Sequence, residues 1–154
     1  MTSQIHIREA RRDDVAAIAA MFAQDTLGGH GDSADPADLY LYLAAFDRIA
    51  VSPNDRLFVA LIDNEVVGTF QTTLITSLTG RGATSLTLEA VHTRHDRRGE
   101  GIGAVMVRHA IEMGRANGVR LVQLMSNAAR QDAHRFYEGL GFSRSHYGFK
   151  MKMP

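Results

Sequence analysis

The stretch Arg98-Gly99-Glu100-Gly101-Ile102-Gly103-Ala104 joins a strand pattern that ends near Thr93 to an apolar helix pattern that begins at Ile102. A glycine-rich turn that leads a strand into a helix N-terminus is a typical anion site, because the first backbone N–H groups of the helix have no partner within it. Glycine also lets a phosphate approach the backbone closely and adopts a positive φ at little cost. We therefore expect residues 98–104 to bind a pyrophosphate group.

Patterns of apolar residues on both sides of this turn predict the other elements. Before the turn we expect a strand at 5–8, helices at 15–22 and 36–46, a hairpin of strands at 57–62 and 66–70, and a strand at 83–93. After the turn we expect a helix at 102–117, a strand at 121–125, a short helix capped by Asp132 and ended by Gly141, and one or two strands within 142–153. The order β-α-α-β-β-β-α-β-α-β predicts an α/β fold, with one mixed α+β sheet and helices on both faces, in a single domain over 1–154.

Composition excludes several classes of function. The chain has 154 residues and 45% hydrophobic content, which fits one globular domain. Lys+Arg and Asp+Glu both number 17, so no net charge attracts nucleic acid or an acidic membrane. The absence of cysteine excludes a thiol nucleophile, a thiolate metal site and a disulfide. No apolar run approaches the about 20 residues of a membrane span, and the polar start lacks a signal peptide's apolar core, so we expect a cytoplasmic protein.

A dinucleotide is the alternative ligand for the turn, because Gly99–Ala104 also fits the pattern G-x-G-x-x-G/A. A Rossmann domain places this turn after its first strand and has an acidic residue about 20 positions later. Here several strands come first, and Arg120 stands where the acidic residue belongs. The P-loop pattern is missing too, since no Gly-Lys-Ser/Thr follows. A different cofactor with a pyrophosphate fits better.

Two motifs in combination resemble the GNAT N-acetyltransferase superfamily. The first is Arg98-x-x-Gly101-x-Gly103 after a strand, and the second is Phe136-Tyr137-Glu138-x-x-Gly141-Phe142. The C-terminal third is similar to bacterial aminoalkylphosphonate N-acetyltransferases through Ser126-Asn127, Asp132-Ala133-His134-Arg135-Phe136-Tyr137 and Ser145-His146. The resemblance implies the acyl-CoA N-acyltransferase fold, with acetyl-CoA as co-substrate and direct acetylation of a primary amine.

The resemblance also implies which residues hold acetyl-CoA. The main chain of Val91, His92 and Thr93 would contact the pantetheine amides, and one N–H there would polarise the thioester carbonyl. The diphosphate would lie on the turn, which consists of Arg98, Gly99, Glu100, Gly101, Ile102, Gly103 and Ala104. Many family members have an asparagine where this chain has Arg130, so we expect Asn127 to replace that contact to the pantetheine.

Acetyl transfer needs a neutral amine and an acid for the departing thiolate. An alkylamine is almost wholly protonated at pH 7, and exposing its lone pair costs about 4 kcal/mol. We expect Glu89, partly desolvated on the strand that leads to the acetyl site, to act as the base, with His92 or His134 as alternatives. The resemblance aligns Tyr137 with the tyrosine that protonates the CoA thiolate. An aromatic core role for this ring is compatible with that function.

The acceptor is expected to be a small amine, such as an aminoalkylphosphonate. Its walls would come from the loop Gly28-Gly29-His30-Gly31-Asp32 and from Arg130, His134 and Arg135, whose cations suit a phosphonate or carboxylate. Asp32, Asp35 and Asp38 would suit a cationic acceptor instead, and the sequence leaves both open.

Other interpretations of the chain concern metals, activity and assembly. His92-x-x-His95, His134 and His146 lack the spacing of a metal motif, so we expect no structural metal site. A weakly held divalent ion that helps an anionic substrate bind stays an open alternative. A non-catalytic acyl-CoA-binding sensor and a transferase for peptide N-terminal amines are alternatives on the same fold. The C-terminal strand would also offer an edge for a homodimer.

Overall fold

Five strands form one mixed sheet in the order β1-β2-β3-β4-β5 in the computed structural model, which describes residues 3–27 and 30–154. The elements are β1 (His6–Glu9), α1 (Val15–Ala23), α2 (Leu39–Val51), β2 (Asp55–Ile62), β3 (Glu65–Thr76), α3 (Thr79–Gly82), β4 (Thr84–Thr93), α4 (Ile102–Ala116), β5 (Leu121–Leu124) and α5 (Gln131–Gly139). Neighbours from β1 to β4 pair antiparallel, whereas β5 is parallel to β4. The predicted mixed sheet is confirmed.

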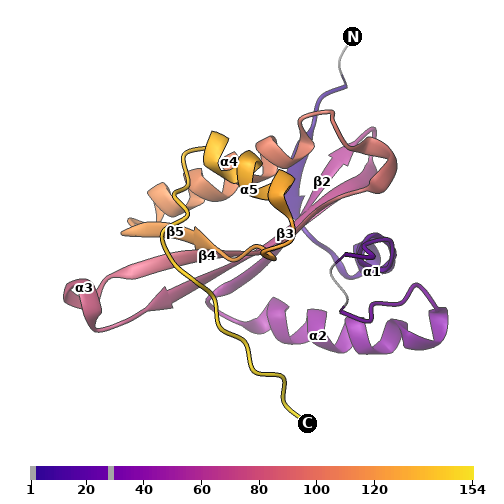
Figure 1. Cartoon of the computed structure of the whole chain (residues 1–154). Coiled ribbons are helices and arrows are strands. Elements are labelled where there is room, and N and C mark those ends of the chain that lie inside the picture. The colour runs from indigo at the N-terminus through magenta and orange to yellow at the C-terminus, as the bar shows by residue number, and fades with distance from the viewer. Residues whose placement is uncertain (1–2, 28–29) are drawn as a thin grey trace.

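Helices cover both faces of this sheet: α1 and α2 lie on one face, and α4 and α5 on the other (Figure 1). The larger core lies under α4, where Ile102, Met106 and Ala110 recur on one helix face and pack with Phe70 and Leu86 of the sheet. A smaller cluster joins α1 to the opposite face. Each face of the central strands is therefore buried, and the ligand site has to lie at an edge or at a strand end.

The expected elements are found with two differences. Asp132 is not the N-cap of α5, because Arg130 holds the N-cap position and Asp132 lies in the first turn of the helix. The expected strand within 142–153 is also wrong, since no regular element is found there. A strand obtains its backbone hydrogen bonds only from a neighbour, and within the described ranges no strand lies beside this segment.

A partly buried ion pair ties β1 to the start of α1. The Arg8 guanidinium donates to the Asp14 carboxylate at 2.7 and 3.1 Å, and the Arg11 backbone N–H donates to it at 2.7 Å. Burial alone raises the pKa of Asp14, but the hydrogen bonds from Arg8 and Arg11 outweigh it and hold the pKa below its usual range. The charged form of Asp14 therefore stabilises the fold.

Replacing Asp14 by Asn is expected to lower the free energy of unfolding at pH 7 by about 2 kcal/mol, because two charge-assisted contacts weaken. A carboxylate with a depressed pKa stabilises the folded state above its unfolded pKa and loses this effect as the pH falls through its folded pKa. The difference between the two proteins should therefore shrink in urea titrations below about pH 4. Asp13→Asn, at the exposed neighbouring position, is the control and should match the wild type.

Candidate active site

An open stretch of β4 begins where its pairing with β5 stops. The last pair in the parallel ladder is Leu88 with Leu124, and β4 continues to Thr93 paired only with β3. At Ala90 the backbone has a φ of 51°, and the register with β3 shifts at this bulge. In the described part of the chain no strand covers the other edge of 89–93. Its main-chain groups can therefore pair with an extended ligand, as expected for Val91, His92 and Thr93.

The glycine turn that follows is exposed and shaped for an anion. Gly99 and Gly101 have φ values of 83° and 80°, and a Cβ built on either would meet nothing within 4 Å. Gly101 is the N-cap of α4, whose 15 residues align their peptide dipoles behind it. The Arg98 side chain is exposed and has no hydrogen-bond partner among the described residues. The turn fits a diphosphate.

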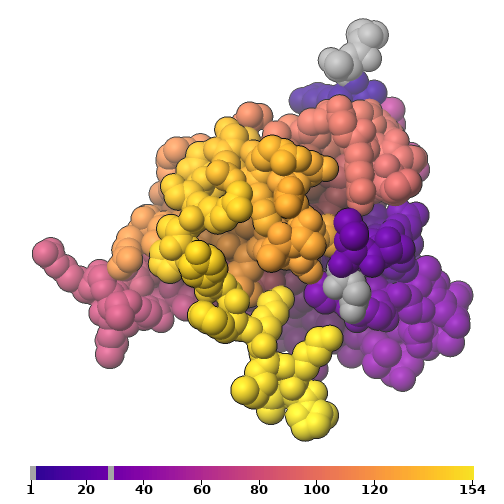
Figure 2. Space-filling view, in the orientation of Figure 1, coloured from indigo at the N-terminus to yellow at the C-terminus, as the bar shows by residue number. Residues whose placement is uncertain are grey.

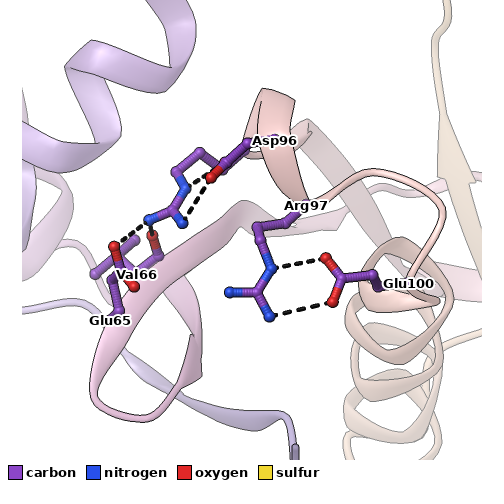
Figure 3. A network of polar contacts seen from close by, with 6 residues as sticks. Glu65, Val66, Asp96, Arg97 and Glu100 are labelled. Atoms are coloured by element: carbon purple, nitrogen blue, oxygen red, sulfur yellow. Dashed lines mark hydrogen bonds and ion pairs between the residues drawn. The ribbon is translucent and has the colours of Figure 1, made fainter. Parts of the chain in front are cut away.

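Arginine–carboxylate pairs hold the segment between β4 and α4 in place (Figure 3). Arg94 donates to Asp96 and to Glu65, each at 2.6 Å, which ties the segment to the turn between β2 and β3. Arg97 donates to Glu100 at 2.7 and 3.1 Å. The Glu100 carboxylate is thus engaged with Arg97. Glu100 can therefore offer a phosphate only its main-chain groups.

Gly101→Ala is expected to raise the Kd for acetyl-CoA about tenfold, because a left-handed backbone costs a residue with a Cβ roughly 1–2 kcal/mol. The turn would relax and its N–H groups would lose their common direction. Gly118→Ala is the matched control, since Gly118 has a φ of 65° with nothing within 4 Å and follows the opposite end of α4. Calorimetric titration should show an unchanged Kd for this variant. Equal losses of affinity would contradict a local role of the turn.

Tyr137 lies on α5, next to the start of α4. Its ring is half-buried between Phe136 and Phe142, with centroid distances of 5.1 and 5.8 Å. A Cβ built on Gly103 would lie 3.3 Å from Phe136 Cζ, so the Phe136 ring of α5 packs directly on the first turn of α4. Burial raises the pKa of Tyr137, although the Arg130 charge opposes the shift. The phenol therefore remains protonated at neutral pH and can serve as an acid.

Three polar side chains from distant parts of the chain meet on the α1 side of β4, and we call them the Asp25 cluster: Asp25, His92 and Arg130. The Asp25 carboxylate is 8% exposed, accepts a hydrogen bond from Arg130 Nη2 at 2.5 Å and lies 3.8 Å from His92 Nε2. The His92 ring also packs edge-on against Phe22, with centroids 4.9 Å apart. Burial lowers the pKa of His92, with Asp25 opposing. The imidazole is thus held neutral at pH 7.

The charge of Arg130 links this cluster to Tyr137, because it lowers the pKa of both His92 and Tyr137. The charge of one guanidinium thus acts on both the imidazole and the phenol. Sequence reasoning missed Asp25, which follows α1 and whose partner Arg130 is 105 positions away. No local pattern marks such a residue.

The other predicted catalytic and pantetheine residues have different surroundings. Glu89 is exposed, so the partial desolvation expected for a base is not found. Asn127 Oδ1 accepts from the Ala129 backbone N–H at 2.9 Å, and the His134 ring contacts the Asn127 carbonyl at 2.9 Å. Asn127 and His134 therefore form hydrogen bonds within the loop before α5. A ligand could contact only the exposed backbone of Asn127 and those of its atoms that these bonds do not use.

Of the predicted acceptor residues, only Arg130 joins the Asp25 cluster. Arg135 pairs with Asp132 on an exposed face of α5, and His30 is exposed. Asp32 accepts from the Tyr42 hydroxyl at 2.8 Å, and Asp35 caps the backbone N–H of Ala37 at 2.9 Å. Gly28 and Gly29 of the predicted wall lie outside the described residues.

Residues 15–142 match the Acetyltransferase (GNAT) family. The chain belongs to the GNAT acetyltransferase family. The family is one of acetyltransferases, and it implies acetyl-CoA as co-substrate. The open edge of β4 and the glycine turn fit that co-substrate. Within residues 3–27 and 30–154, no group of three or more His, Asp or Glu side chains is arranged to hold a metal ion. None of the helices described is both long and apolar enough to cross a membrane.

Solved structures and a curated protein resemble this GNAT chain. A transcriptional regulator from Bacillus halodurans C-125 is 39% identical with a TM-score of 0.93, covering 97% of this chain and 100% of that one. An acetyltransferase of Agrobacterium tumefaciens strain C58 is 26% identical with a TM-score of 0.82, covering 96% and 99%. Aminoalkylphosphonate N-acetyltransferase of Salmonella typhimurium strain LT2 is 42% identical over 52 residues, which are 34% of this chain and 34% of that protein. The match to this curated relative thus spans about a third of its length.

Proposed function

We propose that this chain transfers the acetyl group of acetyl-CoA to the primary amine of a small molecule, with an aminoalkylphosphonate as the first candidate. The observation that supports the proposal is that His92, on the open edge of β4, belongs to the Asp25 cluster, whose Arg130 charge also acts on Tyr137. The partial match to an aminoalkylphosphonate N-acetyltransferase supports the acceptor class.

Acetyl-CoA supplies a thioester whose carbonyl carbon the amine attacks. Neutral His92 accepts the amine proton as the C–N bond forms, and the Asp25 carboxylate stabilises the resulting imidazolium. As the C–S bond breaks, the Tyr137 phenol donates its proton to the sulfur. The His92 imidazolium then releases its proton to solvent, and the Tyr137 phenolate takes one up from solvent, which restores both groups. A main-chain N–H on the open edge of β4 polarises the thioester carbonyl.

His92 is preferred to Glu89 as the base because of its surroundings. The imidazole is held in its neutral form, faces the buried Asp25 carboxylate and shares the influence of Arg130 with Tyr137. Glu89 lies on the same strand but is exposed, so water competes for its carboxylate. Glu89 is the comparison residue in the experiments below.

Arg130 supports an anionic acceptor. A guanidinium has five N–H donors, and the contact to Asp25 uses Nη2. The remaining donors suit the oxygens of a phosphonate or carboxylate, which bind arginine through charge-assisted hydrogen bonds. Asp25 meanwhile holds the guanidinium beside His92, so that an acceptor bound there brings its amine to the imidazole.

The test is release of the CoA thiol from acetyl-CoA with a panel of amines. We expect 2-aminoethylphosphonate to give the highest kcat/KM, followed by amines without an anionic group such as polyamines and amino sugars. Reaction of a peptide N-terminus alone would favour the peptide transferase. Binding of acetyl-CoA without thiol release on any amine would contradict the proposal and favour a non-catalytic sensor.

A further inference from the structure

The side chains of this protein contain almost no primary amines. Of its 17 lysine and arginine residues, only Lys150 and Lys152 are lysines. A guanidinium stays protonated in proteins, whereas a lysine amine can lose a proton and become a nucleophile. An N-acetyltransferase with this sequence has therefore only two side-chain amines of its own to acetylate. Both lie in the C-terminal segment 143–154, which we call the tail.

The tail has few contacts with the rest of the molecule. All its residues are exposed, and it belongs to no helix or strand. Among residues 3–27 and 30–154, no backbone hydrogen bond joins it to another segment. In the space-filling view it stands out from the body of the molecule (Figure 2). A segment with few buried contacts and a solvated backbone moves at little cost in free energy, so the two lysines can change their positions.

The tail touches the sheet beside the open stretch of β4. A Cβ built on Gly148 would lie 3.2 Å from Met125 Sδ. Met125 directly follows Leu124, which forms the last pair between β5 and β4. The tail therefore crosses the sheet where these two strands separate, at the start of the edge that fits acetyl-CoA. Lys150 lies only two residues beyond this crossing.

The Asp25 cluster is within reach of the two lysines. Beyond the crossing, the tail continues toward the side where α2 lies (Figure 1), which is the face of the sheet that holds the cluster. Along β4, His92 is four residues beyond Leu88, the last residue paired with β5, which corresponds to about 13 Å. The two residues from Gly148 to Lys150 span about 7 Å when extended, and the lysine adds a four-carbon side chain. A swing of the tail can therefore bring a lysine amine to His92.

We propose that this chain acetylates its own tail at the side-chain amines of Lys150 and Lys152, an activity that rests on the acetyl transfer proposed above. The lysine ammonium first loses one proton to solvent, and the neutral amine then attacks the thioester carbonyl carbon. His92 accepts a second amine proton as the C–N bond forms, and Tyr137 protonates the sulfur as the C–S bond breaks. The products are an amide on the lysine and free CoA. Each transfer removes one positive charge from the tail.

The mass of the intact full chain after incubation with acetyl-CoA, without any added amine, tests the proposal. We expect the mass to rise in steps of one acetyl group, and peptide mapping to find these groups on Lys150 and Lys152. His92→Ala should slow this modification about 100-fold, because the base is lost. A wild type whose tail remains unmodified, or one that is modified no faster than His92→Ala, would overturn the proposal.

The double variant Lys150→Arg/Lys152→Arg keeps the charge of the tail and removes both amines. It should acquire no acetyl group in the tail and should release CoA thiol with small amines as fast as the wild type. Arg115→Lys is the matched control, since it introduces an exposed lysine in the last turn of α4, away from the glycine turn. This introduced lysine should stay unmodified. Modification at the rate of the tail lysines would show that acetyl-CoA reacts with any exposed amine and would contradict a role of the site.

Dilution tests whether the reaction takes place within one chain. The fraction of tails modified per minute should not depend on the protein concentration, and a rate that rises in proportion to it would overturn the intramolecular step. The outcomes also separate this proposal from the proposed function. A protein that acetylates small amines and leaves its tail unmodified would overturn the self-acetylation alone, whereas a protein that releases no thiol with any amine would contradict both.

Discussion

The Tyr137→Phe variant is expected to turn over about 100-fold more slowly than the wild type, with little change in the Kd for acetyl-CoA. The substitution removes only the hydroxyl, and a phenylalanine ring can keep the contacts with Phe136 and Phe142. Burial raises the pKa of the phenol, so the wild type has its proton in place over the whole neutral range. Without the phenol proton, the thiolate must leave unprotonated or be protonated by water.

The measurement is kcat from thiol release at saturating substrates, with the Kd from calorimetry. Tyr40→Phe provides a matched control, because Tyr40 is an exposed residue of α2 and loses the same atom. Its kcat should equal that of the wild type. An unchanged kcat in Tyr137→Phe would rule out the phenol as the acid and leave its ring as a packing element of α5.

His92→Ala is expected to lower kcat/KM for the amine by about 100-fold at pH 7, a typical contribution of a general base. Under the same conditions Glu89→Gln should stay within about threefold of the wild type, since a solvated carboxylate adds little. The opposite ranking of the two variants would restore Glu89 as the base. Urea titration of both proteins separates a loss of the base from a loss of the fold.

The pH dependence gives a second readout for His92. Burial keeps its pKa below the ordinary value of 6.5, and the base acts only when neutral. The advantage of the wild type over His92→Ala should therefore be complete at pH 7 and shrink as the pH falls through the pKa of His92. A ratio of kcat/KM that stays constant from pH 8 to pH 5 would show that the side chain acts in another way.

Asp25 bears on the predictions for His92 and Tyr137. Its carboxylate positions His92, and it also positions Arg130, whose charge acts on Tyr137. Asp25 is a positioning residue in this scheme, so Asp25→Asn should shift the lower limb of the pH profile further toward acid as well as reduce kcat. A purely structural role would change the stability and leave the shape of the profile intact.

The sequence alone predicts those features of the structure that depend on residues close together in the chain. Asp63 and Asn64 form the two-residue turn between β2 and β3 with φ values of 51° and 64°, a conformation that Asp and Asn tolerate well. Gly101 is the N-cap of α4 within the predicted turn, and Tyr137 lies on α5, the helix that follows β5. Each of these features is encoded within a few residues.

The sequence was insufficient where structure depends on contacts between distant segments. The Asp25 cluster joins the end of α1, β4 and the start of α5. No spacing of residues along the sequence predicts that these three segments come together. The alternation within residues 142–153 predicts a strand, but whether a strand forms depends on which sheet edge lies near enough to pair with it. Solvation of Glu89 likewise depends on the shape of the whole site rather than on its own strand.

The contact between the Phe136 ring and Gly103 also bears on acyl-group selectivity. Because the Phe136 ring of α5 packs on Gly103 in the first turn of α4, the glycine turn and the helix of Tyr137 are held together. In the proposed site this contact fixes the separation between the diphosphate and the sulfur, whichever acyl group the thioester carries. We therefore expect discrimination among acetyl, propionyl and butyryl groups to depend on side chains that contact the acyl chain itself.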